Sequence, residues 1–317
     1  MARGYRRQDL PLSANLAPQG AKRRPGRPYP PDPKIWFNGV FIKENDLPRS
    51  FPAWRMATLG GVYTEFHALR THPRFFADYY AWLTEAAAIA MLPPLANVTE
   101  QAVYEACVGI LNKNMLFNDA LLRLSIFPTP SPNSFSGETM ASSILLEAYK
   151  MGSMGFAPRT RGLLVKVLED CTKALNRRSN VQWLADPAEW ISQRILKDNL
   201  WGDHLLLNSA GRVANAIGGM LYCLIGNDII TPSLSEGVRF DPIRPYVDEA
   251  CIAATGKSPV KRPLTLQELE TASEVFLASS ANGIESVLGV NDSRYPIALS
   301  NTICDKLNRI YFPELFL

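Results

Sequence analysis

Short apolar runs separated by turn residues make up most of the chain beyond its first 33 residues. Two of these runs flank Asn38-Gly39, which predicts a β-hairpin over residues 35–41 because Asn-Gly suits the tight turn between two strands. Further apolar runs predict strands over residues 60–69, 120–127, 143–148, 162–168 and 205–207.

Helical spacing of apolar residues marks other segments. Residues 99–111 begin with Thr99-Glu100, a pair typical of a helix N-terminus, and an amphipathic helix is expected around residues 296–310. Strands and helices are thus mixed along the whole chain, which predicts a fold of the α/β (α+β) class.

Two segments of unusual composition divide the chain. Residues 1–33 are rich in Arg, Lys and Pro and poor in apolar residues, so we expect an extended arm there. Residues 128–137 have the Pro, Ser and Gly content of a linker. The sequence therefore predicts a small N-terminal α/β domain over residues 34–127 and a large C-terminal α/β domain over residues 138–317.

Charge and cysteine content limit the class of protein. The formal net charge of +3 is too small to indicate nucleic-acid binding, and we expect the basic arm to pack on a partner subunit. The five cysteines are odd in number and widely spaced, so we expect no disulfide framework, no metal site and a reduced, cytoplasmic setting. No apolar run approaches the roughly 20 residues that span a bilayer, which predicts a soluble protein.

Residues 178–185 read R-S-N-V-Q-W-L-A and precede a helical segment and the strand at residues 205–207. This stretch resembles the segment R-x-D-I-K-S-L-N that carries the Schiff-base lysine in class IV aminotransferases, the fold-type IV pyridoxal-phosphate enzymes. These include D-amino-acid and branched-chain aminotransferases and aminodeoxychorismate lyase. Weaker pieces at residues 36–39, 61–63 and 272–277 follow in the family's order. The resemblance implies a two-domain fold like that of D-amino-acid aminotransferase, and a homodimer.

The same resemblance implies a degenerate cofactor site. Gln182 falls at the Schiff-base lysine, Trp82 at an arginine that grips the cofactor phosphate, and Asn215 at the glutamate that pairs with the pyridine nitrogen. Pro242 removes a backbone N–H from the helix start that would bind the phosphate, and Asp241 places a negative charge beside it. Ser280 falls at a phosphate-contacting threonine and keeps the hydroxyl. An amide cannot form the imine, so no covalent cofactor is expected at this position.

A first hypothesis gives the cleft between the domains a new use. Tyr63, Glu65 and His67 alternate along one predicted strand and so share a face, which looks into the active site of the relatives. Glu65 and His67 could act as general base and acid on a small metabolite, with Tyr63 and Gln182 as hydrogen-bonding partners. The alternative for His67 is a structural histidine bonded to a backbone carbonyl.

Two other hypotheses stay open. Lys173 lies in T-K-A-L-N, which itself resembles a lysine motif, and a conventional aminotransferase or lyase could use it to hold pyridoxal phosphate. A pseudoenzyme that binds a ligand or scaffolds a partner subunit would also have lost the catalytic set. The sequence does not identify a substrate.

Overall fold

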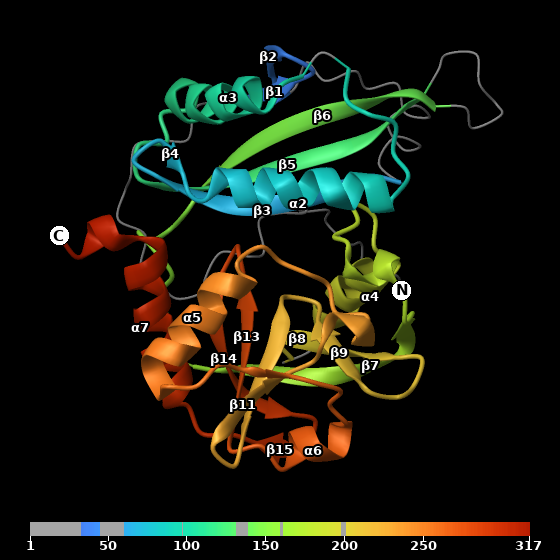
Figure 1. The fold of residues 1–317 in the computed structure, drawn as a ribbon, viewed down its shortest axis with the longest axis vertical. Helices are drawn as coiled ribbons and strands as arrows, with labels where there is room; N and C mark the ends of the chain where they lie inside the picture. Colours follow the sequence, from blue (N-terminus) through green and yellow to red (C-terminus); the bar gives the residue numbers. More distant parts are fainter. Residues whose placement is uncertain (1–32, 45–59, 97, 131–138, 159–160, 198–200) are drawn as a thin grey trace, which may run out of the picture.

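The chain forms two β-sheets, each covered by helices, that meet at a junction bridged by a loop and a short helix (Figure 1). The computed structural model describes residues 33–44, 60–96, 98–130, 139–158, 161–197 and 201–317. The predicted arm over residues 1–33 lies almost entirely outside the described residues.

The first sheet is six-stranded, in the order β2-β1-β6-β5-β3-β4, and its neighbouring strands are all antiparallel. The predicted hairpin is confirmed, because Asn38 and Gly39 have positive φ angles of 45° and 93° and join the first two strands. The strands are β1 (Lys34–Phe37), β2 (Val40–Lys43), β3 (Val62–Leu69), β4 (His72–Pro73), β5 (Asp119–Pro130) and β6 (Thr139–Lys150).

Two helices cover this sheet. α2 (Phe76–Ile89) packs on β3, and α3 (Glu100–Lys113) packs on β1 and β6. As the sequence predicts, Thr99 caps α3, its side chain accepting a hydrogen bond from the Ala102 N–H. The core between helices and sheet includes the fully buried Phe66 and Leu83.

The placement of the strand at residues 143–148 in the second domain is wrong. This strand belongs to β6, which pairs with β5 from Ala120–Lys150 to Pro130–Thr139 and with β1 at Trp36–Leu146. Residues 128–130 of the predicted linker lie in β5 and pair with β6, and the rest of that linker lies outside the described residues. Pairing between strands is not visible in local composition, so the sequence alone could not place this strand.

The second sheet has nine strands, in the order β12-β11-β10-β13-β14-β7-β8-β9, with β15 paired to β14. β14, β7 and β8 run parallel at its centre. The strands are β7 (Leu163–Lys173), β8 (Asp203–Asn208), β9 (Val213–Ala216), β10 (Met220–Ile225), β11 (Asp228–Thr231), β12 (Val260–Lys261), β13 (Glu274–Ser279), β14 (Gly283–Val290) and β15 (Ser293–Arg294).

The helices of this half are α4 (Pro187–Leu196), α5 (Arg244–Thr255), α6 (Leu266–Glu270) and α7 (Leu299–Tyr311), with short 3-10 helices η3 (Arg177–Asn180), η4 (Leu234–Glu236) and η5 (Pro313–Leu315). α5 and α7 pack together at one edge, and α4 lies at the junction between the sheets (Figure 1). None of the described helices is both long and apolar enough to cross a membrane.

The first turn of α7 is held by a buried carboxylate. Glu274 accepts hydrogen bonds from the backbone N–H groups of residues 298, 299 and 300 and from the Ser300 hydroxyl. These N–H groups have no partner within the helix, so a carboxylate here satisfies them and faces the positive end of the helix dipole.

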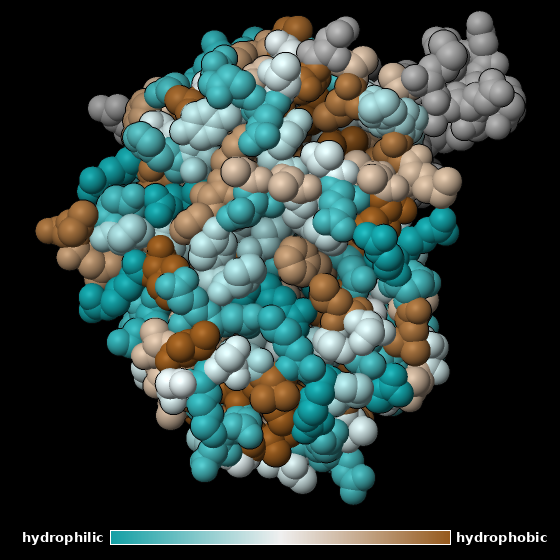
Figure 2. Space-filling view, in the orientation of Figure 1, coloured by the Kyte–Doolittle hydropathy of each residue, from teal (hydrophilic) through white to brown (hydrophobic). Residues whose placement is uncertain are grey.

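The molecular face in Figure 2 mixes hydrophilic residues with small groups of hydrophobic ones. The apolar residues that hold the fold lie instead in two main buried clusters, a large one that includes Val62, Phe66, Val181 and Phe276, and a second within the nine-stranded sheet. The larger cluster has members from both sheets, so the two layers are joined by apolar packing.

Candidate functional site

The loop after β7 joins the two sheets. The Tyr63 N–H donates to the Gln182 carbonyl at 3.0 Å, and the Leu184 N–H donates to the Gly61 carbonyl at 2.9 Å. Gly61 allows this approach, because a Cβ there would lie 2.4 Å from a Leu184 methyl group. The segment that resembles the lysine motif therefore runs along β3, where the halves of the molecule meet.

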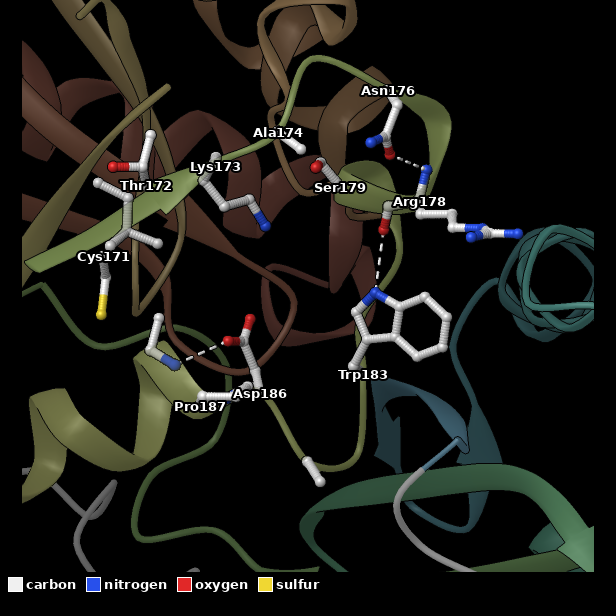
Figure 3. Close-up of a pocket in the computed structure, with 13 residues that line it drawn as sticks. Cys171, Thr172, Lys173, Ala174, Asn176, Arg178, Ser179, Trp183, Asp186 and Pro187 are labelled. Atoms are coloured by element: carbon white, nitrogen blue, oxygen red, sulfur yellow. Dashed lines mark hydrogen bonds between the residues drawn. The ribbon is translucent and has the colours of Figure 1, made fainter. Parts of the chain in front are cut away.

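A pocket of about 360 Å³ opens beside this loop (Figure 3). Its polar lining includes Lys173 at the end of β7, Ser179, Trp183, and Asp186 at the start of α4. Figure 3 shows the Lys173 ammonium pointing into the open space toward Asp186, whereas the Arg178 guanidinium points outward. The remaining lining residues are Cys171, Thr172, Ala174, Asn176, Arg178, Ala185, Pro187, Ala188 and Leu206.

The pKa of the Lys173 amine is lowered toward neutral pH. Burial and, less strongly, the nearby Arg239 guanidinium lower its pKa to about 8, and the Asp186 carboxylate acts in the opposite direction. In the part of the chain that the structure describes, no hydrogen bond or ion pair engages the ammonium nitrogen. At pH 8 about half of these side chains carry a free amine, compared with well under one per cent for an ordinary lysine.

A carboxylate occupies a group of hydrogen-bond donors at the start of α5. We call this group, the Ser280 N–H and hydroxyl and the Ile243 N–H, the cradle. Asp241 accepts hydrogen bonds from the Ser280 N–H at 2.8 Å, from the Ser280 hydroxyl, and from the Ile243 N–H at 3.1 Å. Burial raises the pKa of Asp241, while these three donors and the Arg239 charge act in the opposite direction. Two backbone donors and a hydroxyl converging on one oxyanion form an anion-binding arrangement, and the chain supplies the anion itself.

Two tyrosines extend this arrangement to the first sheet. The Tyr311 hydroxyl donates to the Tyr79 hydroxyl at 2.8 Å, and Tyr79 hydrogen-bonds the Ser280 hydroxyl at 2.6 Å. With Ser280 donating to Asp241, Tyr79 is the donor to Ser280. We call Tyr311, Tyr79, Ser280 and Asp241 the hydroxyl chain. It links α7, α2 and the end of β13, so it crosses the junction between the sheets.

The two amides expected at the cofactor are engaged within the protein or buried. The Asn215 side-chain NH₂ donates to the Ala216 carbonyl at 2.6 Å, and its oxygen accepts from the Arg239 N–H at 3.3 Å. Gln182 is 6% exposed, and its side-chain oxygen has no hydrogen-bond partner among the described residues. Its identification with the Schiff-base lysine stays a prediction.

Trp82 does not face the hydroxyl chain. Its ring packs edge-on against Phe240, with centroids 4.6 Å apart, and its indole N–H is buried without a described partner. Trp82 also lines a second surface pocket of about 450 Å³ together with Leu175 and Asn180. The side chain fills space between α2 and the segment before α5 and brings no charge to an anion.

The structure gives Glu65 and His67 different partners. Glu65 forms an ion pair with Arg123 at 2.6 Å, and Arg123 also lies over the Tyr63 ring. His67 is fully buried, with Nδ1 2.7 Å from an Asp119 oxygen and Nε2 3.1 Å from the Ala281 carbonyl oxygen. Both ring nitrogens are engaged by the protein, which favours the structural alternative for this histidine.

Arg239 and Asp186 were missed as candidates. The Arg239 guanidinium donates to the Ile217 carbonyl at 2.6 Å and lies near Lys173, Tyr63 and Asp241. Asp186-Pro187 is a recognisable helix start, and Asp186 does cap α4 through the Ala188 N–H. That pattern indicates a cap, whereas its approach to Lys173 depends on how the loop folds back.

Comparison with known proteins defines the fold. No profile of a known protein family matches the chain. A probable branched-chain-amino-acid aminotransferase of Aquifex aeolicus is 28% identical over 116 residues, which are 35% of this chain and about a third, 36%, of that protein.

Solved structures match along nearly the full length. The branched-chain aminotransferase of Thermoproteus uzoniensis, solved with norvaline, has a TM-score of 0.77 at 17% identity, covering 89% of this chain and 96% of that one. The enzyme of Thermobaculum terrenum in its pyridoxal-phosphate form has a TM-score of 0.76 at 15% identity, covering 90% and 95%. The chain therefore has the class IV aminotransferase fold.

Proposed function

We propose that this protein acts on a small anionic metabolite in the pocket beside Lys173, without pyridoxal phosphate held in the manner of the class IV aminotransferases. The observation that carries this proposal is the Asp241 carboxylate in the cradle formed by Ser280 and Ile243. A phosphate group would need the same donors.

The negative charge of Asp241 supports this proposal as much as its position in the cradle does. A phosphate brought to the cradle would meet the ionised Asp241 at contact distance, and two like charges at that distance in a buried site repel strongly. Pyridoxal phosphate therefore does not fit this part of the site as the chain folds it. Protonation of Asp241 would ease the repulsion but would leave its side chain in place.

The positions expected at the cofactor ring support the same conclusion. An amide at Gln182 cannot form an imine or carry a proton to and from a substrate carbon. An amide at Asn215 cannot hold a pyridine nitrogen in its charged form, and its polar atoms already bind Ala216 and Arg239.

Lys173 and Asp186 are better placed for acid–base chemistry than Glu65 and His67. Lys173 faces an open pocket with a pKa of about 8, so it can take up and release a proton near neutral pH. His67 has no free ring nitrogen, and Glu65 is paired with Arg123. The Arg239 guanidinium beside Lys173 supplies a positive charge with which an anionic ligand can pair.

The test is to open the cradle by D241A. We expect the variant to lose about 2–4 kcal/mol of unfolding free energy in buffer without anions, because two or three donors lose their acceptor. Inorganic phosphate should restore part of this loss, about 1.4 kcal/mol at ten times its dissociation constant. Thermal and urea unfolding with and without phosphate measure both effects.

D203A is the matched control, because Asp203 is also buried and accepts two backbone N–H groups, from His204 and Gly218. Phosphate should not rescue D203A. If wild-type protein bound pyridoxal phosphate as tightly as D241A does, Asp241 would not exclude the phosphate and the proposal would fail.

A second candidate function is a pyridoxal-phosphate aminotransferase or lyase that uses Lys173. The observation in its favour is the amine facing a pocket with a lowered pKa. Adding pyridoxal phosphate to the wild-type protein, reducing with borohydride and measuring intact mass tests it. A cofactor-sized mass gain mapped to Lys173 at stoichiometric cofactor would establish this function in place of the first.

A further inference from the structure

We propose that Lys173 is a covalent nucleophile that forms an imine directly with a small oxo acid in its pocket, without any cofactor. This inference rests on the proposed function, because it requires that the pocket be free of pyridoxal phosphate. It goes further in naming the reactive atom, the bond that forms and the chemical class of the ligand.

The position of Lys173 suits a nucleophile. It is the last residue of β7, and its backbone is held against the end of β8, by the register with Asn208 and by the Ser209 N–H that donates to its carbonyl at 2.9 Å. The side chain is half-buried and leads from this rigid strand end into the pocket (Figure 3). A nucleophile on a strand is held more precisely than one on a loop.

The charges around the amine keep it reactive. Burial and the Arg239 guanidinium both disfavour the ammonium form, and proximity to a second cation is a recognised way to activate a lysine for imine formation. With a pKa of about 8, roughly a quarter of the side chains are neutral at pH 7.5. Lys166 on the same strand is exposed and does not line the pocket, so it lacks this burial.

Asp186 is placed to handle the protons of this reaction. The amine nitrogen attacks the carbonyl carbon, a C–N bond forms, and the nitrogen's proton moves to the carbonyl oxygen to give a carbinolamine. Loss of that oxygen as water, with one proton delivered by an acid, leaves the C=N bond of the protonated imine, which gives the neutral imine when its N–H proton returns to the base. Asp186 lines the same pocket and interacts electrostatically with Lys173, so it can relay these protons directly or through water.

The ligand class follows from size and charge. A space of about 360 Å³ lies at the small end of the usual range for ligand pockets, so it suits a compact molecule. The Arg239 guanidinium adds positive charge near the amine, and Asp186 is the acidic side chain of the lining. A carbonyl compound with a carboxylate is attracted to this field more than a neutral aldehyde is.

The experiment is reductive trapping on the full chain without pyridoxal phosphate. Wild-type protein is incubated at pH 7.5 with pyruvate or glyoxylate and cyanoborohydride, and the modified lysine is found by intact mass and peptide mapping. We expect one adduct per chain at Lys173, formed at least tenfold faster than at any other lysine. Propionaldehyde, an uncharged aldehyde, should react at Lys173 more slowly than glyoxylate, an aldehyde that carries a carboxylate.

K173R and K166R are the paired variants. K173R should lose the fast adduct and K166R should keep it, and both retain a positive charge. In the wild type the trapping rate should rise with pH up to a midpoint near 8, and D186N should lower the rate at the plateau because a proton relay is removed.

Adducts spread over many lysines at similar rates would overturn the proposal, as would a Lys173 adduct that forms faster with propionaldehyde than with glyoxylate. Trapping of pyridoxal phosphate alone would instead establish the second candidate function. Failure of trapping together with phosphate rescue of D241A would remove the imine and leave the proposed function standing.

Discussion

Asp241 occupies an anion-binding arrangement that would otherwise be open to a ligand. The serine hydroxyl at position 280 and the helix start near Ile243 provide the donors of an anion site, yet a single carboxylate satisfies them from within. Elements that resemble a cofactor site can therefore be kept for structural reasons, because unpaired buried donors are costly.

His67 provides a prediction at the same scale. H67Q should lower the free energy of unfolding by about 3 kcal/mol or more, because it breaks a buried pair with Asp119 and leaves that carboxylate buried without its partner. Carbonyl trapping at Lys173 should be unchanged. Urea unfolding and the trapping rate measure the two effects.

The exposed His72 supplies the control, and H72Q should stay within about 0.5 kcal/mol of the wild type. A normal stability of H67Q with a large loss of reactivity would mean that His67 belongs to the reactive site after all.

At this scale the sequence singled out several residues of the candidate site. Lys173 and Ser280 were recognised as candidates from their neighbours in the chain, and Asp241 was recognised as a negative charge beside the anion site. The entry of the Asp241 carboxylate into the cradle depends on the approach of two segments nearly forty residues apart, which no local pattern encodes. Arg239 escaped notice because a lone arginine in a loop carries no local signal.

Among the elements, α7 depends on a residue outside itself. Glu274, at the start of β13, occupies the N-terminal turn of a helix that begins 25 residues later. The helix has no capping side chain of its own, so β13 sets where it begins.

E274A should cost about 3 kcal/mol, because three backbone N–H groups and the Ser300 hydroxyl lose a charged acceptor. Hydrogen exchange should then be faster in the first turn of α7 than in α5. E268A removes the partly exposed capping-box glutamate of α6 and should cost about 1 kcal/mol. Equal losses for the two variants would contradict the role of Glu274.

Elements with local signals were the ones the sequence predicted well. The Asn-Gly hairpin and the Thr99-capped helix are set by neighbouring residues, and both are confirmed. The sheet to which β6 belongs is set by pairing with β5 across a connection and with β1 more than a hundred residues away, so composition alone misplaced it.

For the whole molecule, the hydroxyl chain is a polar link between the two sheets. Y79F should lower the free energy of unfolding by about 1–2 kcal/mol, because Tyr311 loses its acceptor and Ser280 loses its donor. The urea transition should also become less steep, since the two sheets would unfold less as one unit. Y80F changes a partly exposed tyrosine on the same helix and should leave both quantities nearly unchanged.

A Y79F transition as steep as that of the wild type would show that apolar packing alone couples the sheets.

The overall fold was predicted from the order of many weak motifs, and the solved structures confirm it at identities of 15–17%. Order along the chain survives when individual residues change, because the same apolar pattern still forms the same layers. A single change of a side chain in the cleft can alter the chemistry, because no other residue replaces it. For that reason the fold was recognised more readily than the chemistry.

A ligand that belongs to the chain cannot be diluted away. Asp241 lies two residues before Ile243, one of its own donors, so its effective concentration at the cradle is well above the millimolar values typical of flexible tethers. A diffusible phosphate at millimolar concentration or below is therefore at a lower concentration than the Asp241 carboxylate with which it competes for the cradle. The cradle is therefore insensitive to metabolite levels, whereas the pocket at Lys173 stays open to small molecules.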